Sequence, residues 1–499
     1  MKKKKATIAC VTLLVAAQLT ACGSEANTSA STQNGAGAES STEGGTKVSG
    51  GSSVFTGELE QNVTIRVLEN DTAISKGYFD ELIAAFNEEY ADYGIKAVDA
   101  NMDQYSDLAN DGPYGYGPDV LYQANDVIMQ YAEGKHIYPI PAESMECYSQ
   151  IPESAWEAYE TTVDGTTYCC GVPVNIQAPM LYYRTDLLPE DWETAWDQDG
   201  NKVPDMVENW NDMYAYSIAR HEADASKYGY MKSLYDAYFS SGFLFSYGGY
   251  LFGENNTDPS DIGLSKGEAE KGAWVLSQLA TVMNEECIDD TITTNAYSKL
   301  ADGTYFATIT TPDLYSTFLD ELTAEYEKEG LDAEQAKEKA KENLVMTELP
   351  KLPESGNLTE ENPTLIDSKM MGGVNGYAIS AYTKYPNASL AFVDFATSYE
   401  MMLKRSEMLG IAPAREDAAE KAGGTSELLY ENLEAGNIIL MPSIQEVSQF
   451  WTPAQTFFTD LAKDAFRPEG EKKYTDLSSF KTGLEEMDAQ IYDAIFTLK

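Results

Sequence analysis

The sequence predicts an α/β fold of two lobes, and three observations carry this prediction. The chain has 499 residues, so it is longer than one ordinary domain and has enough apolar residues to form more than one hydrophobic core. A strand, a helix and a second strand follow one another near the start, and this succession is typical of a mostly parallel sheet flanked by helices. Segment 168–189 has the pattern of a chain that crosses from one lobe into another.

The first strand is expected over 63–67, where apolar and polar residues alternate. Apolar residues at helical spacing follow over 79–90, and 95–98 reads as the second strand. Ligands of such sheets bind beyond the carboxyl ends of the strands. Asn70 and Asp71 stand at that position after the first strand, and we expect them in a binding site.

Segment 168–189 contains two apolar runs with a break between them. In the first run Val172, Val174 and Ile176 alternate with other residues, as in a buried strand. Ala178-Pro179 interrupts the pattern directly after the polar Gln177, and a second run follows over 180–183. A crossing between lobes explains this pattern, and so does a core strand followed by a turn.

The charge balance argues against a nucleic-acid-binding function. The chain has 34 Lys and Arg against 81 Asp and Glu, a formal net charge of −47. Binding to phosphates depends on clustered Lys and Arg, so we expect no nucleic-acid partner. The same charge repels anionic lipid surfaces, and attachment to a membrane therefore needs an explicit anchor.

The N-terminus supplies a candidate anchor. Residues 2–5 are all Lys, 6–19 are mainly apolar, and Leu-Thr-Ala-Cys ends the segment, so 1–21 reads as a secretory signal. The tetrad resembles a bacterial lipoprotein processing box, which implies a lipid on Cys22 and a place on the extracellular face of the cell membrane. The alternative is an ordinary signal with an incidental Cys. Residues 22–57 are rich in Ser and Gly, and we expect a disordered tether there.

Four further cysteines lie beyond the tether and show no metal-binding spacing. They are Cys147, Cys169, Cys170 and Cys287. We expect buried apolar thiols, because the adjacent pair cannot easily bridge to itself. A disulfide from Cys147 to one member of that pair stays open, since export permits disulfides.

Four blocks of sequence resemble extracellular solute-binding proteins of the maltose-binding type. They are GPDVLYQAND at 117–126, the crossing segment 168–189, LYDAYF and SYGGYLF within 234–252, and the run from Met-Pro to Gln-Phe-Trp at 441–451. The blocks occur in the family's order, and the resemblance covers about 63–491 with two insertions. It implies a two-lobed periplasmic-binding-protein-like fold with hinge crossovers, each lobe being a mostly parallel sheet flanked by helices.

The resemblance also implies where the lobes begin and end. The N-terminal lobe would comprise 58–176 plus 370–416, and the C-terminal lobe 177–369 plus 417–499. Inserted charged helices are expected at about 318–344, where Glu and Lys recur at a spacing of four residues around Gly330.

The resemblance further implies a set of ligand-binding residues. Asp126 and Asp236 match carboxylate positions of the family, while Tyr238 and Trp451 match aromatic stacking positions. Gln123 and Asp313 stand where maltose binders place two other stacking Trp residues. The full candidate set is Asn70, Asp71, Tyr122, Gln123, Asp126, Gln177, Asp236, Tyr238, Asp313 and Trp451. Aromatic planes cover the C–H faces of sugars, and carboxylates and amides bond their hydroxyls.

The function implied is that of a monomeric, lipid-anchored component of an ABC importer. It would capture a maltodextrin-like oligosaccharide between the lobes, close on it and deliver it to the transmembrane permease subunits, without a cofactor. The replaced Trp residues leave other neutral oligosaccharides, peptides or cationic ligands such as polyamines open. We find no nucleophile, phosphate-loop or metal-ligand motif and expect no enzyme, although a glycan hydrolase with two paired carboxylates remains the alternative.

Overall fold

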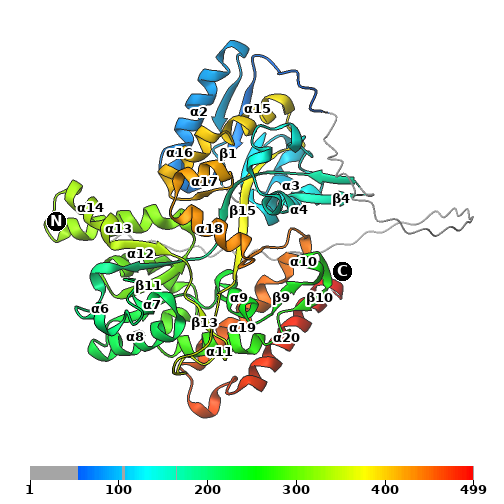
Figure 1. The fold of residues 1–499 in the computed structure, drawn as a ribbon. Helices are drawn as coiled ribbons and strands as arrows, with labels where there is room; N and C mark the ends of the chain where they lie inside the picture. Colours follow the sequence, from blue (N-terminus) through cyan, green and yellow to red (C-terminus); the bar gives the residue numbers. More distant parts are fainter. Residues whose placement is uncertain (1–53, 104–106, 164–165, 498–499) are drawn as a thin grey trace, which may run out of the picture. The chain divides into compact units, whose positions relative to one another are not determined.

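The computed structural model describes residues 54–103, 107–163 and 166–497, and these residues form two lobes of mixed helix and sheet (Figure 1). Cys22, the predicted signal and most of the predicted tether lie outside the described residues. The two-lobed α/β prediction is confirmed.

The N-terminal lobe is built on one sheet with the strand order β16-β6-β15-β3-β1-β2. Ile65 and Val67 of β1 are fully buried, and Phe79, Leu82 and Phe86 of α2 form one apolar face at helical spacing. The main elements are β1 (Thr64–Leu68), β2 (Lys96–Asp99), β3 (Val120–Ala124), β6 (Val172–Gln177), β15 (Met370–Ile379), β16 (Ala412–Pro413), α1 (Asp71–Ser75), α2 (Tyr78–Glu89), α4 (Asn125–Glu133), α15 (Pro386–Ala396), α16 (Tyr399–Leu409) and α17 (Glu416–Ala422).

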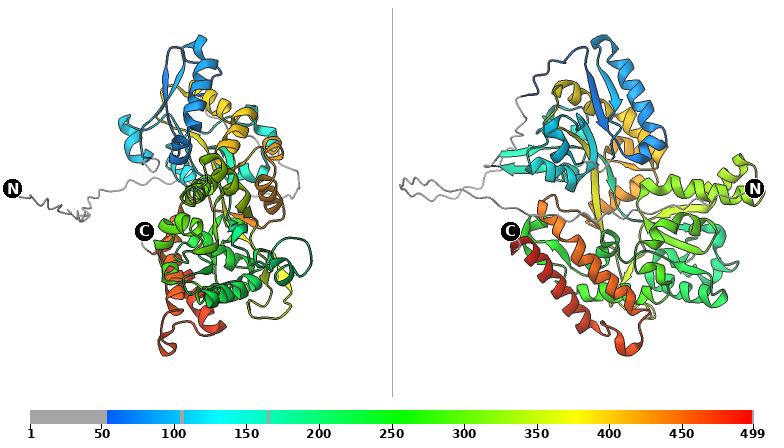
Figure 2. Two further views of the ribbon diagram at one scale, coloured as in Figure 1. Left: turned by 90° about the vertical axis from the view of Figure 1, so that its left-hand side faces the viewer. Right: turned by 180° about the vertical axis from the view of Figure 1, so that it is seen from behind.

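The C-terminal lobe contains a second sheet in the order β12-β7-β11-β8. Trp210 is fully buried against Tyr230 and Phe243 in the core of this lobe. Helices α19 and α20 lie side by side on the face seen from behind in Figure 2. The main elements are β7 (Met180–Arg184), β8 (Tyr228–Tyr230), β11 (Tyr305–Thr310), β12 (Leu344–Thr347), α8 (Trp210–Ala223), α9 (Ala237–Ser246), α11 (Ala269–Ala280), α19 (Trp451–Asp464) and α20 (Leu477–Phe496).

Shorter elements complete the two lobes and their junction. They are α3 (Leu108–Asp111), α5 (Glu153–Glu157), β4 (Glu160–Val163), β5 (Thr166–Cys169), α6 (Trp192–Ala195), α7 (Asp205–Glu208), β9 (Tyr250–Phe252), α10 (Gly253–Asn256), β10 (Asp258–Gly263), α12 (Thr291–Ala301), α13 (Tyr315–Lys328), α14 (Ala333–Asn343), β13 (Leu352–Pro353), β14 (Leu365–Ile366), α18 (Thr425–Glu434) and β17 (Ile438–Leu440).

The expectation of mostly parallel sheets is wrong. In the N-terminal lobe β1 is parallel to β2 and β3, but β15 is antiparallel to β3 and β6. In the C-terminal lobe β7 is antiparallel to both β11 and β12. The physical reason is the hinge, because strands that leave a lobe and strands that return to it run in opposite directions.

The chain crosses between the lobes along extended segments. The first crossing joins β6 to β7 through Ala178 and Pro179, as the break in segment 168–189 predicts. The second is β15, whose Met371 lies in the C-terminal core while Val374 lies in the N-terminal core. The buried N-terminal core draws on 65–174 and 374–414, and the C-terminal core on 181–371 and 441–495. The predicted end points of the lobes stay a prediction.

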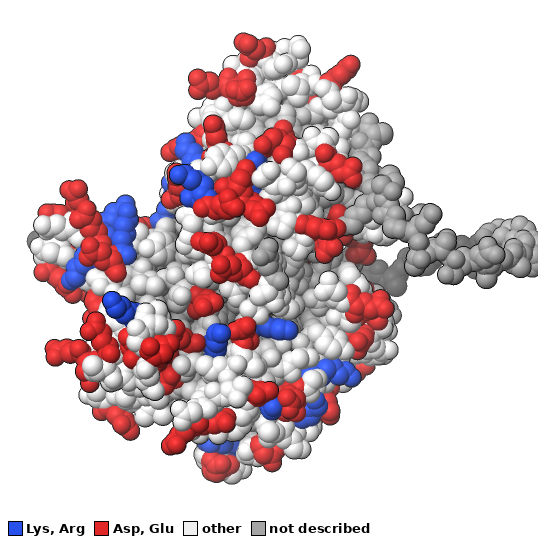
Figure 3. Space-filling model, viewed as in Figure 1, with Lys and Arg blue, Asp and Glu red and all other residues white. Residues whose placement is uncertain are grey.

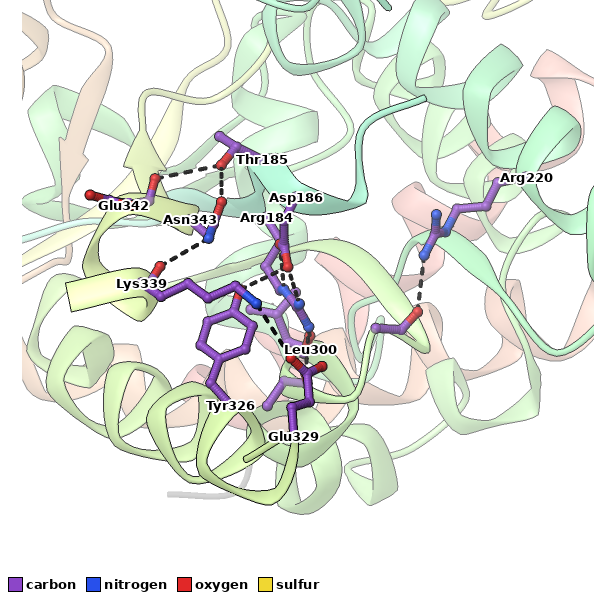
Figure 4. Close-up of polar contacts among 12 residues, drawn as sticks. Arg184, Thr185, Asp186, Arg220, Leu300, Tyr326, Glu329, Lys339, Glu342 and Asn343 are labelled. Carbon is purple, nitrogen blue, oxygen red and sulfur yellow. Dashed lines mark hydrogen bonds and ion pairs between the residues drawn. The ribbon is translucent and has the colours of Figure 1, made fainter. Parts of the chain in front are cut away.

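The charged segment forms two helices, α13 and α14, with Gly330 between them at φ 105°. Polar contacts hold this pair to the end of β7 (Figure 4). The Tyr326 hydroxyl donates to Asp186 Oδ2 at 2.7 Å, and the Arg184 guanidinium pairs with the same carboxylate. The Lys339 ammonium lies 4.0 Å from the centre of the Tyr326 ring. The helices are therefore anchored at their base and solvated along their charged faces.

The apolar stretch over 386–409 forms two consecutive helices. They are α15 and α16, separated at Thr397 and Ser398. The Thr397 hydroxyl donates back to the Val393 carbonyl at 2.8 Å, and Arg415 donates to the Thr397 carbonyl at 3.2 Å. These bonds satisfy the end of α15 and turn the chain into α16.

All four cysteines of the described part of the chain are buried and free, which confirms the prediction of buried thiols. The disulfide from Cys147 that the sequence left open is not formed. Burial raises the pKa of the Cys147 thiol to about 11 and that of Cys170 to about 12, so both stay protonated at neutral pH. Within the described ranges no group of side chains could hold a metal ion, and no helix is long and apolar enough to cross a membrane.

A fully buried ion pair joins distant parts of the N-terminal lobe. Glu69, at the end of β1, accepts from Arg405 of α16 at 2.9 and 3.0 Å, and both side chains are at most 1% exposed. The Tyr377 hydroxyl donates to the same carboxylate, and the guanidinium stacks 4.2 Å from the centre of the Tyr122 ring. The pair therefore ties β1, β3, β15 and α16 together.

Replacing Arg405 with Met should destabilise the protein by about 3–5 kcal/mol, because Glu69 would remain buried without its cation. The measurement is urea unfolding at neutral pH, followed by circular dichroism. Lys404→Met is the matched control on the same helix, since Lys404 pairs with Glu81 at the surface and such pairs contribute about 1 kcal/mol or less. Equal losses in the two variants would contradict a special role for the buried pair.

Candidate functional site at the hinge

Polar side chains from both lobes meet where β6 ends, and Gln177 is the centre of this hinge cluster. Its Nε2 donates to Asp313 Oδ1 at 2.8 Å, and its Oε1 accepts from Asn375 Nδ2 at 2.7 Å. Its backbone carbonyl accepts from the Tyr238 hydroxyl at 3.2 Å. We define the hinge cluster as Gln177, Tyr238, Asp313 and Asn375. It connects the two crossing strands to two elements of the C-terminal lobe.

Local structure positions the C-terminal members of the cluster. Asp313 lies in the short 3₁₀ helix Pro312–Leu314, directly beyond the carboxyl end of β11. Tyr238 lies in the first turn of α9, and the Asp236 side chain caps this helix by accepting from the Tyr238 amide at 3.2 Å. Burial raises the pKa of the Tyr238 hydroxyl, so it remains a hydrogen-bond donor at neutral pH.

Two candidates from the sequence have structural roles in this structure. Tyr122 is only 4% exposed, its hydroxyl donates to Asn175 and Arg405 covers its ring. Burial raises the pKa of Tyr122 to about 12. Asn70 caps α1, with its side chain accepting from the Ala73 amide at 2.8 Å. We therefore leave both residues out of the proposed ligand contacts.

Asp126 presents a buried oxygen without a partner. Its Oδ1 has no hydrogen bond to any described residue, and burial raises the pKa of this carboxyl. The neighbouring Asn125 fixes the start of α4, because its Nδ2 donates to the Met441 carbonyl and to Ser443 Oγ, both at 3.0 Å. A buried acceptor without a donor is costly in an empty site. It is suited to accept a hydrogen bond from a ligand hydroxyl.

A cavity of about 440 Å³ lies along the neighbouring face of α4, with Gln130 and Tyr131 in its wall and Asp126 outside it. Val127, the residue after Asp126, forms part of its wall, and the opposite wall includes Gln445 and Ser448. The first wall belongs to α4 and the second to the segment that leads into α19. Space for a ligand therefore exists between elements of the two lobes.

The remaining candidates lie on elements around the hinge cluster. Trp451 is the first residue of α19, half-buried and edge-to-face with the buried Phe450. Gln123 is half-buried in β3 opposite Gly376, and Asp71 is exposed at the start of α1. Direct contacts thus join Gln177, Tyr238 and Asp313, while the other candidates are carried by neighbouring strands and helices.

Sequence analysis missed Asn375 and Asn125. Asn375 is an amide in an otherwise apolar run of β15, as Gln177 is in β6. This shared feature is the signal that could have identified it. Asn125 does not cap α4, which begins without a side-chain cap, and it bonds the facing segment instead.

Comparison with known proteins matches residues 81–430 to the family described as bacterial extracellular solute-binding protein. The chain belongs to this family. It is 26% identical to the maltodextrin-binding protein MdxE of Bacillus subtilis (strain 168), over 78% of this chain and 82% of that protein. It is 23% identical to a maltooligosaccharide ABC transporter solute-binding lipoprotein of Streptococcus pneumoniae R6, with 78% and 83% covered.

The fold is shared with a solved structure of the maltose-binding protein MalE from Listeria monocytogenes in complex with maltose. The TM-score is 0.65 at 21% identity, and the match covers 87% of this chain and 98% of that one. The two-lobed solute-binding fold is thus established by shape as well as by sequence. The family and both relatives are binding proteins rather than enzymes.

Asp126→Asn should stabilise the protein at pH 7 and weaken ligand binding. The folded pKa of Asp126 is raised by burial, so the native state holds its proton to a higher pH than the unfolded chain does. The stabilisation that the protonated carboxyl gives the native state is fully present below the unfolded pKa of about 4. This stabilisation is lost as the pH rises through the folded pKa. The amide is never ionised, so the gain should be seen at pH 7 and disappear near pH 3.

The measurement is urea unfolding of both proteins at the two pH values, with ligand titration at pH 7. Asp92→Asn, at an exposed position, is the control and should change neither quantity. A loss of stability at pH 7 in Asp126→Asn would show that the carboxylate is satisfied within the protein and is not held ready for a ligand.

Proposed function

We propose that this protein is the lipid-anchored binding component of an ABC importer and that it captures an oligosaccharide between its lobes. Membership of the solute-binding family supports the transport role. The relatives named for maltodextrin and maltooligosaccharide support a glycan as the ligand. The observation that carries the proposal is the hinge cluster, which gathers hydrogen-bonding groups of both lobes at the end of β6.

The side chains around the cluster suit the chemistry of sugars. Trp451 and Tyr238 offer aromatic faces for the C–H surfaces of a pyranose ring. Asp126, Asp236 and Asp313 supply acceptors for its hydroxyls. This combination binds a glycan without any catalytic step.

The proposed mechanism is closure of the hinge on the ligand. A ligand that contacts Asp126 of one lobe and Trp451 of the other stabilises the conformation in which both are within reach. The permease subunits would then recognise the closed form of a monomer. The acidic surface, visible in Figure 3 as Asp and Glu side chains spread over both lobes, keeps the folded part away from anionic lipid.

The proposal is tested first by a thermal-shift screen of the purified protein against maltooligosaccharides, cyclodextrins, other oligosaccharides, peptides and polyamines. A ligand at 100 times its Kd adds about 2.7 kcal/mol of stability. We expect a rise in Tm with one glycan class, which is recovered intact. A rise only with peptides or polyamines would discard the sugar, and hydrolysis of the glycan would make the protein an enzyme.

Trp451→Ala should weaken binding of the tightest glycan of that screen by about thirtyfold or more, because buried aromatic anchors contribute about 2 kcal/mol or more each. Isothermal titration calorimetry measures the change. Trp192→Ala, in α6, is the matched control and should bind as the wild type does. Unchanged affinity in Trp451→Ala would remove Trp451 from the site.

Cys22→Ala should release the protein from membranes, because the lipid that we propose on Cys22 is its anchor. The measurement is the distribution of the protein between membrane and soluble fractions of the producing cells. Cys10→Ala, within the predicted signal, is the control and should remain in the membrane fraction. Continued attachment of Cys22→Ala would overturn the lipoprotein assignment.

A further inference from the structure

Lys232 is a buried cation that the hinge cluster does not use. It follows β8 in the C-terminal lobe and is only 7% exposed. Its ammonium lies 3.3 Å from the centre of the Phe239 ring. Within the described residues this ammonium forms neither a hydrogen bond nor a salt bridge. A buried ammonium normally needs acceptors, because a cation–π contact replaces only part of its lost hydration.

A small cavity of about 30 Å³ lies beside this ammonium. Its wall combines Lys232 with Thr308 and Thr310, which stand two residues apart on β11 and therefore on one face of that strand. The rest of the wall is mainly apolar and includes Leu314, the residue after Asp313, together with Ile292 and Phe318. The cavity therefore lies near the carboxyl end of β11, on the strand that leads to Asp313, and no residue of the hinge cluster lines it.

The electrostatics around the cavity favour an anionic guest. Burial lowers the pKa of Lys232 to about 8, and the Asp236 carboxylate acts in the opposite direction. Asp236 is the α9 cap and forms no salt bridge with the ammonium among the described residues. A guest carboxylate would supply the charge-assisted hydrogen bonds that the ammonium lacks, and the two Thr hydroxyls can donate to the same group.

The size of the cavity limits what can enter it. A space of about 30 Å³ holds one or two water molecules, so it admits a carboxylate but excludes a sugar ring. A neutral hydroxymethyl group would fit by size and leave the cation without a counter-charge. Exposed acids further than about 8 Å are largely screened at physiological salt. The carboxylates of Asp126, Asp236 and Asp313 act on the nearby Tyr238, so an acidic guest depends on Lys232 for its counter-charge.

We propose that Lys232 binds the carboxylate of a uronic acid residue, so that the ligand is an acidic oligosaccharide rather than a neutral glucan. This inference rests on the proposed function and names the substrate class of the same site. The ring of the acidic sugar lies against the hinge cluster, and its carboxylate enters the cavity between Lys232 and the two Thr hydroxyls. Lys232 is then the residue that determines the choice between acidic and neutral glycans.

The test compares wild type with Lys232→Met by calorimetric titration at pH 7. The probes are matched pairs: oligogalacturonides and their methyl esters, acidic aldotetraouronic acid and xylotetraose, oligomannuronate and mannotetraose, with maltotetraose as a further neutral glycan. Met keeps the length of the side chain and its contact with Phe239. Lys266→Met, at an exposed position of the same lobe, is the charge-matched control.

We expect wild type to bind one acidic probe at least tenfold more tightly than its neutral partner, in line with charge-assisted hydrogen bonds of about 1.5 kcal/mol or more. Lys232→Met should lose this preference, and Lys266→Met should keep it. Thr308→Val, which removes one hydroxyl at nearly constant volume, should reduce the preference in part. This second variant keeps the test informative should Lys232→Met fold poorly.

Two results would overturn the inference. Tight binding of a neutral glycan by wild type, unchanged in Lys232→Met, would leave the cavity as a water site and the proposed function intact. An acidic preference that survives in Lys232→Met would place the carboxylate elsewhere. If no glycan of either class binds, the proposed function fails together with the inference.

Discussion

The side-chain amide of Gln177 is the interaction on which the hinge depends. An amide is both a donor and an acceptor, so this one side chain bonds Asp313 in the C-terminal lobe and Asn375 in the returning strand β15 at the same time. Loss of the amide would leave both partners unsatisfied in a half-buried place, which costs more than the bonds themselves contribute. The position where the chain crosses is thereby also the position where polar groups of both lobes are held together.

Contacts within the N-terminal lobe hold the strand that carries Gln177 in place. The buried pair of Glu69 and Arg405 fixes β1, β15 and α16, and Arg405 also packs on Tyr122. Tyr122 in turn donates to Asn175, two residues before Gln177 on β6. The buried ionic network thereby restrains the strand that carries the hinge amide. The hydrogen-bonding groups of the hinge cluster can therefore keep their positions when the lobes close.

Buried polar atoms without a partner among the described residues occur in several parts of the fold, and one of them, Asp126 Oδ1, belongs to the candidate site. Asp126 has a buried oxygen without a donor, and the Lys232 ammonium lies over the Phe239 ring and forms no hydrogen bond or salt bridge with the described residues. Each group lowers the stability of the unliganded protein. A ligand can supply the missing partner, which is a hydroxyl for the carboxylate and an anion for the ammonium. Glu69 and Arg405 are buried as deeply and pair with each other, with Arg405 Nε left without a partner among the described residues.

By itself, the sequence determined the features that depend on local patterns. Alternation identified β1 and β6, helical spacing identified α2, and Ala178-Pro179 marked the crossing, because side chains a few residues apart decide each of these. It failed where distant segments meet, in the direction of β15 against β3 and in the burial of Tyr122 under Arg405. Only the tertiary structure brought Gln177 to Asp313, 136 residues away, and to Asn375, 198 residues away. Such contacts depend on the path of the whole chain through the hinge, and no short stretch of sequence encodes that path.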